Sequence, residues 1–329
     1  MSGVEGGDEP DRVERDQADP SHPDDAASAL QAHLRSARAD FEEANERIKE
    51  RTGRDLIVAI LIALAIGAVV VASLVFLKQL FVLFALAAVG LAVWEFSRAL
   101  QAAGHRVDII PQTVCAAALV VTGWVYGGRW IWWIALFGAV VLVIAWRFIG
   151  QMIARDGRTY GAVLDDVVLA PFIQLYVALT GSLCVVLLDQ DRGEWWVLSF
   201  LIVAVAADTG AYASGLLFGR HPMAPRISPK KTWEGFAGAV AASLAAGVLL
   251  ALFLLGLPWW TGLVFGVVIL ATATCGDLGE SMIKRALGIK DMSSWLPGHG
   301  GVLDRLDSIL LSAPAALALY YLMTPMVTP

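Results

Sequence analysis

Residues 56–76 read LIVAILIALAIGAVVVASLVF, an apolar run that contains no charged side chain. A segment of roughly 20 apolar residues, coiled as an α-helix, is long enough to cross the hydrocarbon core of a bilayer, which is about 30 Å thick. This run therefore predicts a transmembrane helix.

Similar stretches follow along the rest of the chain, separated by charges, prolines and glycines. Of the 329 residues, 57% are hydrophobic and 16% are charged, whereas soluble domains carry roughly 25% charged residues. We therefore predict an all-α, polytopic integral membrane protein with about nine transmembrane helices, in a membrane-embedded domain of residues 54–329. The further spans are expected at residues 79–98, 109–126, 130–150, 167–188, 196–218, 236–256, 258–275 and 306–324.

Two segments of different composition precede this domain. Residues 1–25 are rich in Asp, Glu, Pro, Gly and Ser and predict a disordered acidic tail. In residues 26–53, apolar side chains recur at alternating steps of four and three residues, which predicts an amphipathic juxtamembrane helix. A self-associating coiled coil is the alternative, so a homodimer stays open. The apolar positions are Leu30, Leu34, Ala37, Phe41, Ala44 and Ile48.

Basic side chains in the loops predict the orientation, because cytoplasmic loops carry an excess of Lys and Arg. With the N-terminus in the cytosol, the loop cations that face outward are Lys78, Arg129 and Arg192. We therefore expect a multi-pass protein of the plasma membrane, in contact with membrane lipids, whose N-terminus and active site are cytosolic. The net charge of −6 says little about the membrane domain, because much of the acid lies in the first fifty residues. No nucleic-acid partner is expected.

A polar segment interrupts the apolar domain at residues 281–307, which read SMIKRALGIKDMSSWLPGHGGVLDRLD. Its cations can hold phosphates, and its carboxylates can hold a hard divalent cation. Together they suggest a site for a metal and a nucleotide. The candidate phosphate ligands are Lys284, Arg285, Lys290 and Arg305.

Pairs of acidic residues at the ends of the last two predicted spans are the candidate ligands of the metal ion. A three-residue spacing brings Asp277 and Glu280 to one helix face, beside Ser281, and Asp304 and Asp307 repeat that spacing. Hard oxygen ligands of this kind suit Mg2+. The two pairs therefore predict a cage of oxygen ligands for Mg2+, and a second cation is left open. Helix capping is the alternative for either of the last two aspartates alone.

A glycine-rich turn lies between these acidic pairs. Residues 297–301 read PGHGG, and glycines permit a close approach of the backbone to a ligand. His299, Gly300 and Gly301 are therefore candidates for substrate binding. His299 could instead hydrogen-bond within the loop.

A second group of polar residues lies in and after the sixth predicted span. A carboxylate such as Asp208 is costly inside a membrane and is kept where it faces a polar cavity or a partner. A structural hydrogen bond to a neighbouring helix is the alternative. The loop that follows is dense in donors and predicts phosphate binding, although basic residues beside a membrane also serve as orientation signals. Its candidates are Arg220, Ser228, Lys230, Lys231 and Thr232.

Taken together, these strings resemble the signature of the phosphatidate cytidylyltransferases, also called CDP-diacylglycerol synthases. The resemblance covers roughly residues 54–325. It implies a nucleotidyltransferase of phospholipid biosynthesis that converts CTP and phosphatidic acid to CDP-diacylglycerol and pyrophosphate, with magnesium required. The matching strings are ADTGAY (207–212), ISPKKTWEG (227–235), GDLGES (276–281), SMIKR (281–285), KD (290–291) and HGGVLDRLD (299–307).

The resemblance also implies roles for single residues. The lipid phosphate would attack the α-phosphorus of CTP, so no side-chain nucleophile is needed. Lys230 stands where the family more often has Asn, which makes Lys231 the matching lysine. By resemblance, the metal site would use Asp277, Asp304 and Asp307, the phosphate charge would be offset by Lys231, Lys284, Arg285 and Arg305, and the cavity would be lined by Asp208.

Two functions of other classes remain as alternatives. In a transporter, Asp208 and glycine-rich broken segments would line a substrate path, but the charge here gathers at one face of the membrane. A transferase that joins an alcohol to a CDP-lipid would also use aspartates and magnesium, but its Asp-Gly-x-x-Ala-Arg string does not occur in this sequence.

Overall fold

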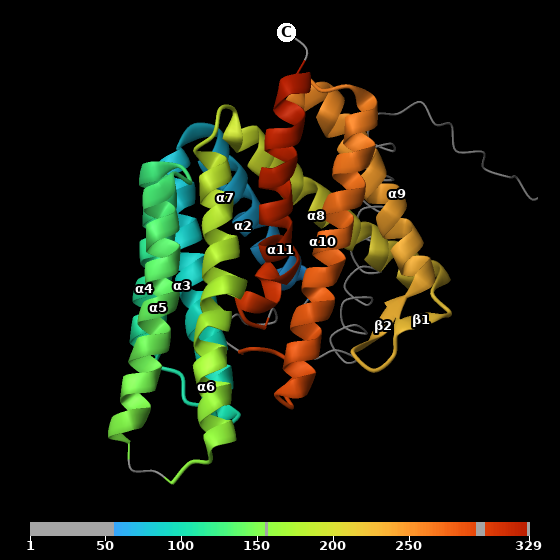
Figure 1. The fold of residues 1–329 in the computed structure, drawn as a ribbon. Coiled ribbons are helices and arrows are strands. Elements are labelled where there is room, and N and C mark those ends of the chain that lie inside the picture. Colours follow the sequence, from blue (N-terminus) through green and yellow to red (C-terminus); the bar gives the residue numbers. More distant parts are fainter. Residues whose placement is uncertain (1–55, 155–156, 294–299, 328–329) are drawn as a thin grey trace, which may run out of the picture. The chain divides into compact units, whose positions relative to one another are not determined.

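The structure is a computed structural model that describes residues 56–154, 157–293 and 300–327. The predicted acidic tail and the predicted juxtamembrane helix lie outside these residues. Among the described residues, eight helices are long and apolar enough to cross a membrane, and α2 is a further apolar helix. Each of the predicted spans coincides with a helix, so the predicted all-α, polytopic membrane fold is confirmed (Figure 1).

Most of the helices are separated by short connections, and the longer ones follow α8 and α10. The fifth span is one continuous run of α6, the π-helical η1 and α7. The elements are α2 (Leu56–Phe76), α3 (Lys78–Ala102), α4 (Ile109–Tyr126), α5 (Trp130–Ile153), α6 (Tyr160–Ile173), η1 (Gln174–Leu179), α7 (Thr180–Leu188), α8 (Gly193–Phe218), α9 (Trp233–Leu250), η2 (Ala251–Leu255), α10 (Trp259–Ala286), α11 (Leu303–Met323) and η3 (Thr324–Met326).

Several helices extend beyond the apolar stretches that predicted them. The eighth stretch was expected to end at residue 275, but α10 continues to Ala286. Lys284 and Arg285 lie in its last turn, where cations interact favourably with the helix dipole. Hydropathy marks only the part of a helix that lipid surrounds, so a polar extension escapes it. The first six residues of the predicted polar segment, 281–286, therefore belong to α10.

The loop after α8 forms a small antiparallel hairpin of β1 (Pro222–Ala224) and β2 (Ser228–Thr232), which the all-α prediction did not include. Glu234 holds the base of the hairpin, because the Glu234 carboxylate accepts hydrogen bonds from the backbone N–H groups of Arg220 (3.1 Å) and His221 (3.2 Å). The Thr232 side chain then caps α9 by accepting from the Gly235 N–H. The hairpin is therefore fixed to the start of α9.

Hydrogen bonds between loops show which helix ends lie together. At one end, the backbone N–H of Arg106 donates to Asp166 at 2.9 Å, and Nε of Arg285 donates to the carbonyl of Ile227 at 3.3 Å. These bonds join the α3–α4 loop to α6 and the hairpin to the end of α10. This is the end at which the polar segment and the hairpin meet, as the sequence predicted for one face of the membrane.

Contacts at the other end join the remaining connections. Nζ of Lys78 pairs with Glu194 at 2.6 Å, and a guanidinium N–H of Arg192 donates to the carbonyl of Leu254 at 2.8 Å. These contacts place the starts of α3 and α8 beside the end of η2. Two of the three cations that were expected outside, Lys78 and Arg192, therefore lie at the end opposite the polar segment.

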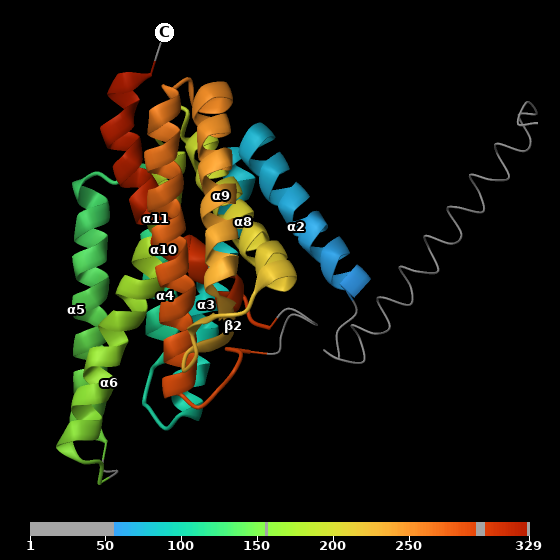
Figure 2. The same ribbon diagram turned by 90° about the vertical axis from the view of Figure 1, so that its right-hand side faces the viewer.

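α10 and α11 pack side by side (Figures 1 and 2), and Gly276 lies at their closest approach. A methyl group at this position would collide with the backbone carbonyl of Asp307 on α11. Small residues allow such close packing of membrane helices. This glycine therefore sets how closely Asp277, the next residue, approaches α11.

We expect Gly276→Ala to destabilise the protein by about 1–3 kcal/mol, the usual cost of overpacking. Gly279→Ala is the matched control on the same helix, because its methyl group would meet no atom within 4 Å. Thermal unfolding of both variants in detergent measures the difference. Equal unfolding temperatures would contradict the packing described for α10 and α11.

Candidate active site

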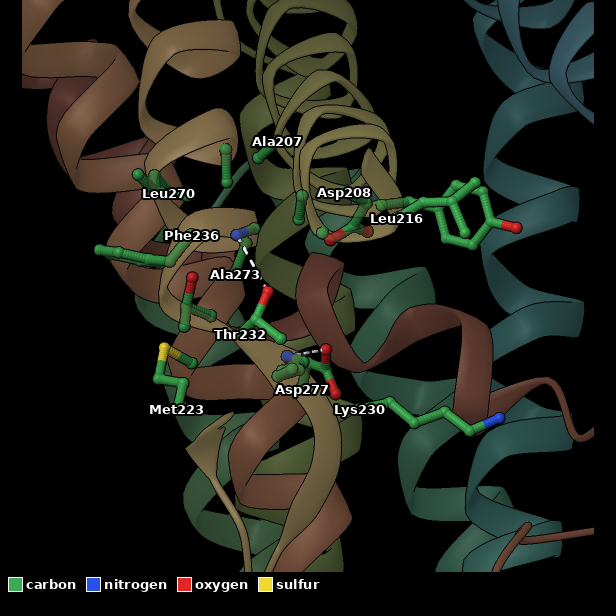
Figure 3. A pocket seen from close by; sticks show the side chains of 17 residues that line it. Ala207, Asp208, Leu216, Met223, Lys230, Thr232, Phe236, Leu270, Ala273 and Asp277 are labelled. Atoms are coloured by element: carbon green, nitrogen blue, oxygen red, sulfur yellow. Dashed lines mark hydrogen bonds and ion pairs between the residues drawn. The ribbon is translucent and has the colours of Figure 1, made fainter. Parts of the chain in front are cut away.

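A cavity of about 430 Å³ lies between α8, β2, α9 and α10. Its wall is mostly apolar, and its polar groups include five of the predicted site residues. Such a combination is typical of a site for an amphipathic ligand. Figure 3 shows these side chains, with the Lys230 side chain extending away from Asp277. The five predicted residues are Asp208, Lys230, Lys231, Thr232 and Asp277.

Asp277 joins the hairpin to α10. One of its carboxylate oxygens forms an ion pair with Nζ of Lys231, and the other accepts a hydrogen bond of 3.4 Å from Oγ of Ser281. The Asp277 and Lys231 side chains are 25% and 29% exposed, respectively, so both remain accessible from the cavity. Three of the predicted residues are thus brought together by contacts between segments far apart in the sequence.

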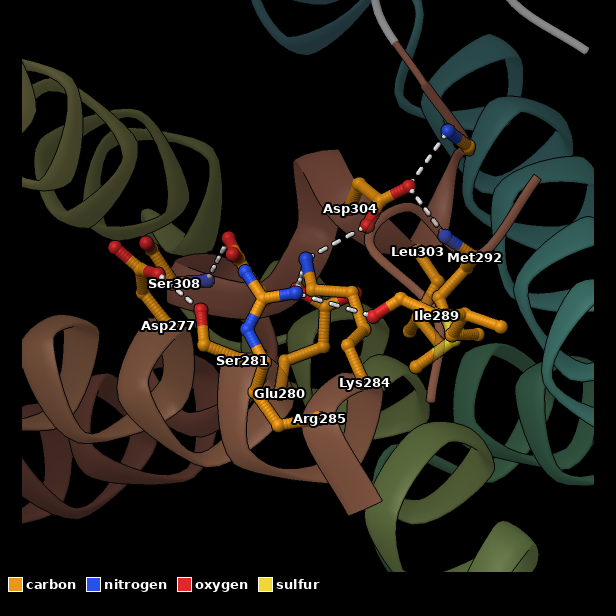
Figure 4. A network of polar contacts seen from close by, with 12 residues as sticks. Asp277, Glu280, Ser281, Lys284, Arg285, Ile289, Met292, Leu303, Asp304 and Ser308 are labelled. Carbon is orange, nitrogen blue, oxygen red and sulfur yellow. Dashed lines mark hydrogen bonds and ion pairs between the residues drawn. The ribbon is translucent and has the colours of Figure 1, made fainter. Parts of the chain in front are cut away.

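Behind this pair lies a more deeply buried group, in which Lys284 connects α10 to α11 (Figure 4). Its ammonium group contacts Glu280 at 2.9 Å and Asp304 at 2.8 Å. The side chain of Glu280 is fully buried and that of Asp304 is 7% exposed. Charges removed from water in this way must be paired, because an unpaired buried charge is strongly destabilising.

Asp304 also holds the backbone at Met292 and Gly301. Its second oxygen accepts hydrogen bonds from the backbone N–H groups of Gly301 (2.7 Å) and Met292 (3.0 Å). Gly300 has a φ of 78°, a backbone conformation that favours glycine. The positive φ of Gly300 agrees with the conformational freedom predicted for these glycines, and the N–H of Gly301 contacts Asp304. His299 lies outside the described residues.

The three aspartates predicted as metal ligands occupy neighbouring helix ends. The charges of Asp277 and Asp307 interact through space, and Oδ1 of Asp307 accepts from the Ser308 N–H at 2.6 Å. Among the described residues, no group of three or more His, Cys, Asp or Glu side chains is placed to hold one metal ion. The shared metal site of Asp277, Asp304 and Asp307 therefore stays a prediction.

The other predicted phosphate ligands differ in their contacts and in their exposure to solvent. Arg285 is engaged with backbone carbonyls, at 3.3 Å from Ile227 and 3.2 Å from Ile289. Ser228 pairs with Ala224 in the hairpin. Arg220, Arg285, Lys290 and Arg305 are exposed.

One residue of this region was missed by the sequence analysis. Glu95 on α3 is 1% exposed, and its carboxylate accepts from Oγ of Ser293 and from the backbone N–H of Leu303. A signal was available, because Glu95 is an acidic residue inside a predicted span, as Asp208 is. Because Glu95 lies close to the end of the predicted stretch 79–98, it resembled a residue at the boundary of the span.

Comparisons with known proteins place this chain in a family. The model of the cytidylyltransferase family matches residues 57–323. The phosphatidate cytidylyltransferase of Mycobacterium bovis is 42% identical over 272 residues, which cover 81% of this chain and 88% of that protein. The protein of the same name from Mycobacterium leprae is 40% identical over 275 residues, with 81% and 88% covered. That of Haemophilus influenzae is 41% identical over 138 residues, with 40% and 48% covered. The chain therefore belongs to the cytidylyltransferase family.

Proposed function

We propose that this protein is a phosphatidate cytidylyltransferase, a nucleotidyltransferase that forms CDP-diacylglycerol and pyrophosphate from CTP and phosphatidic acid. The observation that carries the proposal is the similarity, over 81% of the chain, to relatives that bear this name. The arrangement of the site supports it, because cations and carboxylates surround an apolar cavity at the end of membrane helices.

The reaction needs positioning and charge neutralisation more than proton transfer. An oxygen of the lipid phosphate forms a bond to the α-phosphorus of CTP, and the bond to the bridging oxygen breaks, which releases pyrophosphate. A phosphate is already anionic at neutral pH, so no side chain must deprotonate it. Lys231 and Lys284 offset the charge of the phosphates, as fixed cations do in other phosphoryl-transfer sites. The apolar wall of the cavity suits the acyl chains of the diacylglycerol part of the lipid.

Arg285, Arg305 and Lys290 extend this cationic surface toward the solvent side of the site. Arg305 acts electrostatically on Asp208 in the cavity, so its charge reaches the proposed substrate position. Thr232 and Ser281 add hydroxyl groups beside the lysines and Asp277. These residues remain proposed contacts of the nucleotide and of the lipid phosphate.

Mg2+ fits the donors present. Asp277 and Asp307 are mutually repelling carboxylates on adjacent helices, and Mg2+ in such enzymes is held by one or two carboxylates together with substrate phosphates. When bound, the ion would neutralise the charge of the phosphates. Asp277 and Asp307 would hold it, and Asp304 instead organises Lys284 and the turn.

Incorporation of labelled CTP into lipid by membranes containing the protein tests the function. We expect lipid label only when CTP, phosphatidic acid and magnesium are all present, and a chelator should abolish it. Membranes from cells without the protein are the control. Absence of label under complete conditions would overturn the proposal, whereas label that survives chelation would overturn only the role of magnesium.

We further propose that the site faces the cytosol, where CTP is available, and that the protein lies in the plasma membrane. The loop cations at the site end support this orientation. With the three native cysteines replaced, we expect a cysteine at Lys290 to react with an impermeant maleimide only in inside-out vesicles, and one at Arg192 to react in intact cells. The reverse pattern would contradict the orientation.

A further inference from the structure

Glu95 is a buried carboxylate that contacts both Ser293, after α10, and Leu303, at the start of α11. Its Oε1 accepts a 2.6 Å hydrogen bond from Oγ of Ser293, and its Oε2 accepts a 2.9 Å hydrogen bond from the backbone N–H of Leu303. Glu95 is 1% exposed, and Leu303 is fully buried. A residue of α3 therefore fixes both the segment that leaves α10 and the first residue of α11.

The contact with the turn depends on a glycine. A Cβ atom at Gly301 would lie 2.6 Å from Oε2 of Glu95, a distance at which something must shift. A side chain at Gly301 would therefore displace the Glu95 carboxylate from its present position. This gives Gly301 a physical role that does not require a ligand.

The contacts of Glu95 lead directly to the site. Leu303 precedes Asp304 in the chain, and the N–H of Gly301 donates to Asp304 at 2.7 Å. Asp304 in turn holds the ammonium group of Lys284 at 2.8 Å. A shift of Leu303 therefore moves Asp304, and with it the cation that we assign to substrate phosphates.

The burial of Glu95 itself needs an explanation. A carboxylate inside a membrane helix is costly, and it is kept where it has specific partners. A leucine at position 95 would pack equally well and would carry no desolvation penalty. The partners of Glu95 point to the turn and to α11.

We propose that Glu95 is a positioning residue for the active site, which sets the place of Asp304 and Lys284 through the hydrogen bonds from Ser293 and Leu303. This inference rests on the proposed function. It adds to that function a residue from α3, a helix that contributes no group to the cavity itself.

Three substitutions separate hydrogen bonding from charge and from packing. Glu95→Leu removes both acceptors at similar volume, and we expect kcat to fall about 100-fold, as when a reacting group is displaced by about 1 Å. Glu95→Gln can still accept from Leu303 and can donate to the Ser293 hydroxyl, so it should retain kcat within about threefold. Ser293→Ala removes one contact and should lower kcat about 10-fold, with little change in the KM for CTP.

Ser97→Ala is the matched control. Ser97 is fully buried two residues further along α3, and its hydroxyl has no hydrogen-bond partner among the described residues. Tryptic cleavage after exposed Lys290 provides a readout that does not depend on activity, and cleavage after exposed Arg129, at the other end of the chain's helices, is its internal reference.

The expected result is faster cleavage after Lys290 in Glu95→Leu and Ser293→Ala, with cleavage after Arg129 unchanged and Ser97→Ala like the wild type. Wild-type kcat and wild-type cleavage in Glu95→Leu, or in Ser293→Ala if the former does not fold, would overturn the inference. Faster cleavage after both Lys290 and Arg129 would also overturn the inference, because it would indicate a general loss of structure. If the wild type does not use CTP and phosphatidic acid, the proposed function fails, while the cleavage rates still decide whether Glu95 holds the turn.

Discussion

Asp277→Asn is expected to lower CTP incorporation into lipid by about 1000-fold, the upper part of the range for loss of one preorganised electrostatic group. Asp277 lines the cavity, pairs with Lys231 and faces the charge of Asp307. Asparagine keeps the shape of the side chain but removes the negative charge that we assign to cation binding. The lost charge should act mainly on kcat, because it matters most when charge moves to the leaving pyrophosphate.

The same substitution should leave stability nearly unchanged. The ion pair of Asp277 with Lys231 is about a quarter exposed, and exposed pairs contribute less than about 1 kcal/mol. Thermal unfolding in detergent should therefore resemble that of the wild type. Asp165→Asn, which changes an exposed carboxylate at the same end of the helices, is the matched control. Activity of Asp277→Asn close to that of this control would remove Asp277 from the proposed site.

Hydropathy predicted the fold of this chain well because membrane spans obey a simple length requirement. It could not predict how far helices continue into polar surroundings, as α10 does through Lys284 to Ala286. There the helix is held by contacts with α11 and with the hairpin, which depend on residues far away in the sequence. The hairpin itself was read as a loop, because its strands are short and carry no alternating apolar pattern.

Charge predicted which residues belong to the candidate site, but it could not predict their pairing. Spacing along a helix suggested a common role for Asp304 and Asp307 as metal ligands. In the structure Asp304 is engaged by Lys284 and by two backbone N–H groups. The partners of Glu95 were likewise unpredictable, since they are about two hundred residues away in the sequence.

Asp304→Asn is expected to lower both activity and stability, which distinguishes it from Asp277→Asn. The amide oxygen can still accept from the N–H groups of Gly301 and Met292, but its NH2 group then faces the ammonium group of Lys284. Breaking a buried ion pair in this way costs about 3–5 kcal/mol. Displacement of Lys284 should lower CTP incorporation by about 100-fold. Thermal unfolding and the labelled-CTP assay measure the two effects.

Magnesium dependence separates the two roles considered for Asp304. If it only organises Lys284 and the turn, a roughly tenfold excess of magnesium will not restore the activity of Asp304→Asn, because the lost contacts are with an ammonium group and backbone N–H groups. If it binds the metal, excess magnesium will recover part of the activity by mass action. Asp307→Asn is the informative comparison, since Asp307 has no ion pair among the described residues. We expect added magnesium to rescue Asp307→Asn in part and Asp304→Asn not at all, and the opposite result would return Asp304 to the metal site.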